Sequence, residues 1–182
     1  MKWKISPNYW NTDFSWPLKL EDKIEIFHDQ ITGWQLDIAD KIINDKSVVE
    51  RLGNHAGFAA LHIVLCYFET MEKYRCGFVD KYDSKKYFKD GVKRIFPELD
   101  SQSHDMLYKL RNGFYHGSSL TRNAMLTHDQ VPLSFDPKES LLVVDPHRLV
   151  PRLREDFVEY VKQLRDTSNL QLRQNFEKRF DS

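Results

Sequence analysis

The sequence predicts an all-α protein, an up-and-down bundle of about five helices with a small β-hairpin or flap between the last two helices. Over several long stretches the apolar residues recur every three or four positions, which is the spacing of one face of a helix. Between residues 123 and 145 this spacing is replaced by short β-prone pieces separated by Asp and Pro. With 41% hydrophobic and 30% charged residues, the chain has the composition of a folded domain.

Five helices account for most of the predicted structure. The first covers residues 21–45, and the second covers residues 54–75, where apolar residues on nearly all sides indicate a central position in the bundle. A third, residues 84–96, ends before a proline, and a fourth, which either Ser101 or Ser103 can cap, ends at Gly117. The last begins at about residue 147 and is expected to bend or fray towards Phe180.

Residues 21–182 are predicted to form a single domain, and residues 1–20 an aromatic N-terminal arm. The arm has two prolines and five aromatic residues without helical spacing, so we expect its rings to pack on the domain. No apolar stretch approaches the roughly 18 to 20 residues needed to cross a bilayer, and no secretory signal is recognised. We therefore expect a cytoplasmic protein with no membrane partner, and its two cysteines, which form no Cys-x-x-Cys pair, agree with a reducing compartment.

The formal net charge is zero, which excludes the strongly basic balance of a general nucleic-acid-binding protein. The charges are nevertheless uneven along the chain. Residues 21–50 contain eight acids and three bases, whereas residues 81–94 contain six bases and two acids, and residues 148–179 contain eight bases and five acids. These runs are either solvated helix faces or an acidic side opposite a side that attracts phosphate.

The most informative stretch, Leu110 to Gly117, lies at the C-terminal end of the predicted fourth helix. On a helical wheel its apolar residues form one stripe, and its polar and tyrosine residues form another face that is directed away from the core. An arginine can hold a phosphate, an asparagine can orient a nucleophile, and a histidine can transfer a proton near neutral pH. A single histidine here could also interact only with the negative end of the helix dipole. The candidate site residues on this face are Tyr108, Arg111, Asn112, Tyr115 and His116.

This stretch resembles the signature of the HEPN (higher eukaryotes and prokaryotes nucleotide-binding) family, helical bundles that often carry an Arg, commonly a polar residue directly after it, and then a His. Here the signature is Arg111-Asn112 followed by His116 and closed by Gly117. The resemblance in helical order extends over about residues 21–166. A toxin subgroup of the family has a tyrosine two residues after the histidine, where this chain has Ser118, so silencing by modification at that position is not expected.

The resemblance implies a metal-independent endoribonuclease that needs no cofactor. His116 would act as a general base on the 2′-hydroxyl or as an acid on the leaving 5′-oxygen, Arg111 would stabilise negative charge on the phosphate, and Asn112 would orient the groups. The products would be a 2′,3′-cyclic phosphate and a 5′-hydroxyl, so the substrate would be RNA and not DNA. The resemblance also implies a homodimer through the motif helix. Tyr108 and Tyr115 would then lie at the interface or stack on bases, or else be partly buried against a neighbouring helix.

Two other functions are compatible with the same residues. One is a HEPN-like module without catalysis, which binds RNA, a nucleotide or a protein partner such as an antitoxin. The other is a helical scaffold in which the motif is only surface. Cleavage of RNA, binding without cleavage, and the absence of both properties would distinguish the three.

A second copy of the signature, Arg122-Asn123 followed by His128, falls in the predicted flap. No predicted helix organises it there, so we interpret it as a chance match. No metal site is predicted, because the common metal-binding motifs are lacking and His55 and His62 are seven residues apart instead of three or four.

The carboxylates of the predicted second helix have two interpretations. Glu69 and Glu72 lie on one face of that helix and could be partners of Arg111. Surface charge is the favoured interpretation, because most acidic side chains on helices are solvated.

Overall fold

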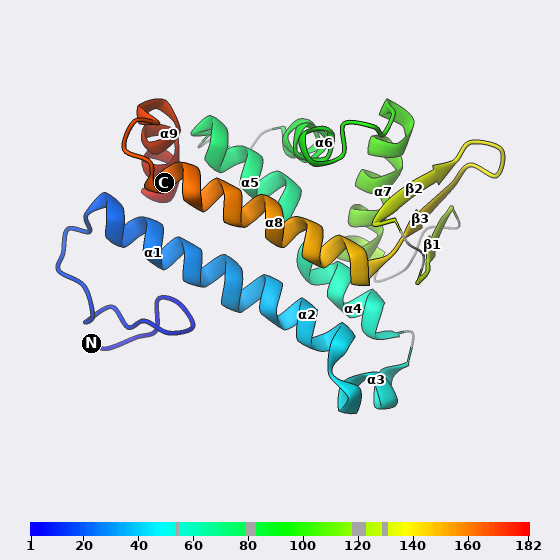
Figure 1. Ribbon diagram of the computed structural model, residues 1–182, viewed down its shortest axis with the longest axis horizontal. Helices are drawn as coiled ribbons and strands as arrows, with labels where there is room; N and C mark the ends of the chain where they lie inside the picture. Colours follow the sequence, from blue (N-terminus) through cyan, green and yellow to red (C-terminus); the bar gives the residue numbers. More distant parts are fainter. Residues whose placement is uncertain (54, 79–82, 118–122, 129–130) are drawn as a thin grey trace.

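The structure is a computed structural model of residues 1–182, and it describes the chain except for residues 54, 79–82, 118–122 and 129–130 (Figure 1). The described residues are mostly helical and contain one small three-stranded sheet, in agreement with the predicted class. They form nine α-helices and one π-helical turn instead of about five helices, because three of the predicted helices are divided and a short helix at residues 46–52 was not predicted. The helices are α1 (Leu20–Ile31), η1 (Thr32–Leu36), α2 (Asp37–Asn44), α3 (Lys46–Leu52), α4 (His55–Val64), α5 (Tyr67–Cys76), α6 (Ser84–Ile95), α7 (Ser101–Gly117), α8 (Pro146–Arg165) and α9 (Leu170–Phe180).

The predicted first helix follows one continuous path, but the π-helical turn η1 lies between α1 and α2. Ile31 before the turn and Leu36 at its end are buried, whereas Trp34 and Ile38 are exposed. Trp34 and Ile38 belong to the apolar three- and four-residue spacing that predicted the first helix, so that spacing wrongly placed them on its core-facing side. A π-helical turn holds more residues than an α-helical turn, so it changes which residues face the core beyond it.

The predicted second helix lies in the core as expected, but it is divided into α4 and α5 at Leu65 and Cys66. Leu61 and Phe68, on either side of the division, are both fully buried. Helix α6 approaches α5 so closely that a Cβ on Gly91 would lie 2.3 Å from the carbonyl oxygen of Phe68. Neither Pro nor Gly, the usual helix-breaking residues, lies at this division. The apolar spacing alone therefore did not predict it.

The flap is a sheet of β1 (Ala124–Leu126), β2 (Leu133–Asp136) and β3 (Leu141–Val144) in the order β1-β3-β2. Strands β2 and β3 form an antiparallel pair, and β1 pairs with β3 in parallel. Figure 1 shows the sheet at one end of the molecule, beside α7 and the start of α8. Along the chain the sheet lies between α7 and α8, and the further helix α9 follows α8.

Helix α8 runs antiparallel to the path of α1 and α2 (Figure 1). The predicted bend of the last helix is a complete break, since α8 ends at Arg165 and α9 is a separate helix. Phe176 of α9 is fully buried, with its ring 5.3 Å from that of Phe27 in α1. The C-terminal helix therefore contributes to the same hydrophobic core as α1 and α8.

The N-terminal arm is attached to α1 by polar contacts. Asp29 accepts hydrogen bonds from the Ser6 hydroxyl (2.6 Å) and from the backbone N–H of Asn8 (2.7 Å). The rings of Trp3 and Trp16 are exposed, so the expectation that the arm packs its rings on the domain is wrong for these two. Among the described helices, none has the length and apolar character that crossing a bilayer requires.

Candidate functional site

Helix α7 positions the candidate residues through its apolar stripe. Leu107, Leu110 and Phe114 are buried, and the ring of Phe114 lies 4.6 Å from that of Phe58 in α4. The predicted stripe is therefore confirmed. Because the stripe fixes the rotation of α7, Arg111 reaches Glu69 of α5, and Tyr115 reaches His62 near the end of α4.

Arg111 is not on open solvent, because only 20% of its side chain is exposed. Its guanidinium donates one hydrogen bond to Glu69 of α5 (Nη2 to Oε2, 3.0 Å) and one to the adjacent Asn112 (Nη1 to Oδ1, 3.0 Å). The guanidinium carbon also lies 4.8 Å from the ring centroid of Tyr115 and 5.9 Å from that of Tyr108. The cation is thus held on several sides in one orientation.

Glu69 links three helices at this site. Besides Arg111, it accepts hydrogen bonds from Lys73 of its own helix and from the Ser84 hydroxyl at the start of α6. Burial acts to raise the pKa of this carboxyl, but the hydrogen bonds from Lys73 and Ser84 and the nearby positive charges outweigh burial, so its pKa lies below the ordinary value. Glu69 is therefore ionised at neutral pH and complements the charge of Arg111.

The favoured interpretation of Glu69 as a surface charge is wrong, since its side chain is only 12% exposed. The other carboxylate, Glu72, accepts a hydrogen bond from Arg94 of α6 (3.1 Å) and belongs to a separate ion-pair group. The spacing between Glu69 and Lys73, four residues apart on one helix, was the signal in the sequence for a paired carboxylate.

The two tyrosines of the motif face have different surroundings. Tyr115 is 42% exposed, and its hydroxyl contacts the carbonyl oxygen of His62 at 3.5 Å. Burial, followed by the neighbouring Cys66 thiol, raises the pKa of Tyr115 to about 12, so the phenol stays neutral. Tyr108 packs on the core side, with its ring 5.5 Å from that of Phe88 in α6.

Asn112 and His116 complete the candidate site. Asn112 is partly buried and oriented by Arg111, whereas His116 is exposed in the last turn of α7. Four residues apart on a helix, the two side chains are neighbours on one face. The turn therefore presents an oriented cation, an amide and an accessible imidazole. Ser118, which follows it, lies outside the described residues.

The second copy of the signature has other contacts. Arg122 lies outside the described residues. The Asn123 amide donates a hydrogen bond to the carbonyl oxygen of Ser140 (3.1 Å), across the sheet. The ring of His128 lies 4.6 Å from that of His147 at the start of α8. Asn123 therefore supports the flap, and His128 belongs to another part of the surface.

No metal site with a full set of protein ligands is present among the described residues, where no three His, Cys, Asp or Glu side chains converge suitably. His55 is exposed, and His62 packs its ring 5.1 Å from that of Tyr115, so these two histidines do not form a pair. Comparison of the chain with family models, with curated proteins and with solved structures gives no match.

Proposed function

We propose that the last turns of α7 form the active site of a metal-independent endoribonuclease of the HEPN type. The observation that carries the proposal is the fixed orientation of Arg111, which Glu69, Asn112 and Tyr115 hold on the same helix whose last turn carries the exposed imidazole of His116. A cation that is already oriented can stabilise developing negative charge without reorganising during the reaction.

The reaction would be an attack of the RNA 2′-oxygen on the adjacent phosphorus. His116 takes the proton of the 2′-hydroxyl, a bond forms between the 2′-oxygen and phosphorus, and the bond from phosphorus to the 5′-oxygen breaks. The 5′-oxygen leaves as a hydroxyl after accepting a proton, either from a solvent molecule or from a second imidazole. Arg111 lies next to the phosphate and compensates its increasing charge, while Asn112 restricts the guanidinium.

A homodimer would bring two such turns together across a two-fold axis. The proposal places Tyr115 at that interface, because a tyrosine that is 42% exposed offers both apolar area and a polar hydroxyl. Two copies of His116 would then supply the base and the acid. Analytical ultracentrifugation measures whether the chain dimerises and whether Tyr115→Ala weakens the dimer.

RNA cleavage in EDTA tests the proposal directly. The intact chain should release a 2′,3′-cyclic phosphate and a 5′-hydroxyl from RNA, and it should not cut DNA of the same sequence. His116→Ala should abolish cleavage at an unchanged melting temperature, since this side chain is exposed. His55→Ala, at another exposed histidine, is the matched control and should cleave normally. Equal cleavage by both variants would remove His116 from the mechanism.

A second candidate function is a HEPN-like module that binds RNA, a nucleotide or a protein partner without cleaving RNA. The ion pair between Arg111 and Glu69 favours it, because a guanidinium that already has a carboxylate partner is less available to a phosphate. Binding of labelled RNA that survives His116→Ala, with no cleaved product from either protein, would establish this function instead.

A further inference from the structure

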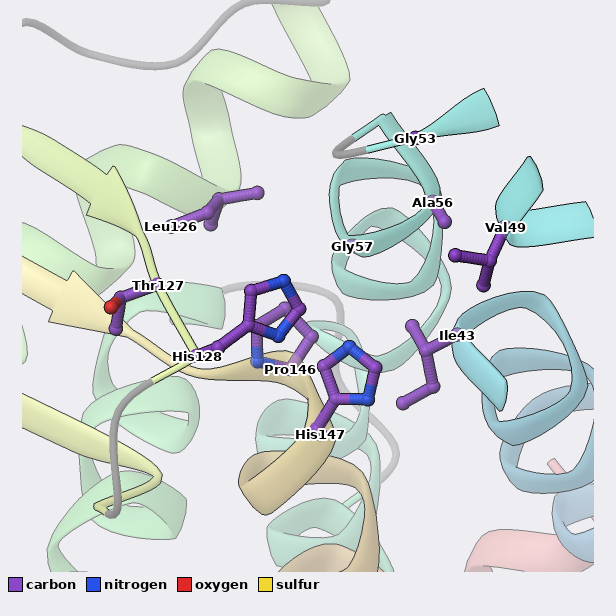
Figure 2. Close-up of a pocket in the computed structure, with 10 residues that line it drawn as sticks. All are labelled: Ile43, Val49, Gly53, Ala56, Gly57, Leu126, Thr127, His128, Pro146 and His147. Atoms are coloured by element: carbon purple, nitrogen blue, oxygen red, sulfur yellow. The ribbon is translucent and has the colours of Figure 1, made fainter. Parts of the chain in front are cut away.

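A cavity of about 220 Å³ lies where α2, α3 and α4 meet the end of β1 and the start of α8 (Figure 2). Its walls include the apolar side chains of Ile43, Val49 and Ala56 on the helical side. On the opposite side lie the rings of His128 and His147. The two imidazoles thus face a largely apolar space that is separate from the candidate site on α7.

His147 is held firmly at this cavity by the beginning of α8. Its backbone N–H donates a hydrogen bond to the side chain of Asp145 (2.9 Å), which caps the helix. The backbone of α4 closes against the same region, because a Cβ on Gly57 would lie only 3.1 Å from Cγ of Pro146. The position of His147 relative to α4 is therefore defined by close packing.

The two rings have the separation expected for a shared metal ion. A metal-to-nitrogen bond of about 2.0 Å places an imidazole centroid roughly 3.2 Å from the metal, so two ligands at angles of about 90° to 110° have centroids about 4.5 to 5.2 Å apart. The measured distance between the centroids of His128 and His147 is 4.6 Å. In Figure 2 one nitrogen of each ring lies on the side that faces the other ring.

We propose that His128 and His147 bind one divalent transition-metal ion of the copper, nickel or zinc type. Imidazole nitrogens are common ligands for these ions. Because no third suitable side chain converges within the described part of the chain, the remaining coordination positions are open to water or to a small ligand in the cavity. This site is independent of the proposed nuclease, which needs no metal.

Titration of Cu²⁺ into the metal-free, tag-free chain tests this site. Calorimetry should show one equivalent of bound Cu²⁺, and its electron paramagnetic resonance spectrum should show coupling to two imidazole nitrogens. His128→Ala and His147→Ala should each weaken binding at least ten-fold. His55→Ala is the matched control and should bind as the unsubstituted chain does, because His55 does not line the cavity.

The His128 variant keeps the test valid if His147→Ala disturbs α8. His128 is exposed at the end of β1 and makes no contribution to the capping of that helix, so circular dichroism and the melting temperature should be unchanged in His128→Ala. Absence of saturable binding by the unsubstituted chain would overturn the proposal. Equal affinity of the unsubstituted chain and His128→Ala would overturn it as well.

Discussion

The two copies of the Arg-Asn and His signature show how far the same residue types can differ in their surroundings. In the first copy, Asn112 contacts its own arginine, and Arg111 is held by a carboxylate from another helix. In the second copy, Asn123 binds a backbone carbonyl of the flap, and His128 faces a histidine of α8. The helix supplies one common face for the first copy, whereas the strand and loop of the second copy distribute its residues between two different neighbours.

Substitution of the two arginines should give the largest difference between the copies. Arg111→Ala should lower the rate of RNA cleavage by about 10² to 10³-fold, which is typical for loss of a group that stabilises an oxyanion. Arg122→Ala should cleave at the unsubstituted rate. The rates are measured in EDTA with one labelled RNA. Arg111→Lys keeps the charge but not the planar guanidinium, and it should restore only part of the activity. A similar loss in both alanine variants would make the second copy functional.

The contribution of the Glu69 carboxylate to the first copy can be measured as a change in the free energy of unfolding. Glu69→Gln should lower the free energy of unfolding by about 1 to 3 kcal/mol, because Arg111 and Lys73 lose a charged acceptor in a half-buried place. Urea denaturation measures the change. Glu155→Gln, at an exposed partner of Arg152, is the matched control and should change the stability by about 0.5 kcal/mol or less. Equal effects would show that Glu69 is an ordinary surface charge.

Substitution of the asparagine in each copy should affect a different property, cleavage for the first copy and stability for the second. Asn112→Ala should lower cleavage by about ten-fold, since it removes one contact that orients Arg111. Asn123→Ala should leave cleavage unchanged and lower the free energy of unfolding by about 0.5 to 1.5 kcal/mol, because it removes one hydrogen bond across the sheet. Cleavage rates and urea denaturation of both variants would be compared. If Asn123→Ala instead lowered cleavage and Asn112→Ala lowered only the stability, the second copy of the signature would be the functional one.

The smallest expected effect is a difference in pH dependence. The folded state lowers the pKa of His147 below its ordinary 6.5, so the unfolded chain binds its proton first and stability is lost as the pH falls below about 6.5. Glu69 has a folded pKa below its ordinary 4.5, so its contribution is present above that pH and is lost only at lower pH.

Thermal melts between pH 7.5 and 3.5 measure both responses. His147→Gln should flatten the decrease that begins as the pH falls below about 6.5, whereas Glu69→Gln should flatten the decrease below about pH 4.5. Unchanged slopes in both windows would mean that neither group titrates differently on folding.

The helical class and the inward face of α7 followed from the sequence because apolar spacing is a local property. Leu107, Leu110 and Phe114 are buried as their wheel positions predict. The same reasoning was wrong for Trp34 and Ile38, since a π-helical turn interrupts the regular spacing on which it depends.

The partners of the candidate residues could not be predicted in the same way. Glu69 precedes Arg111 by 42 positions, and its selection over Glu72 depends on how α5 packs against α6 and α7. The four-residue spacing to Lys73 indicated a paired carboxylate, but it did not indicate which arginine would join the pair.

The sequence by itself determined which side chains share a face of one helix, because a helix repeats every 3.6 residues wherever it lies in a protein. It therefore placed Arg111, Asn112 and His116 together. Only the tertiary structure decided that Glu69 holds the guanidinium and that His128 meets His147 beside a cavity. These contacts join segments that are far apart along the chain, and the packing of the whole core selects them.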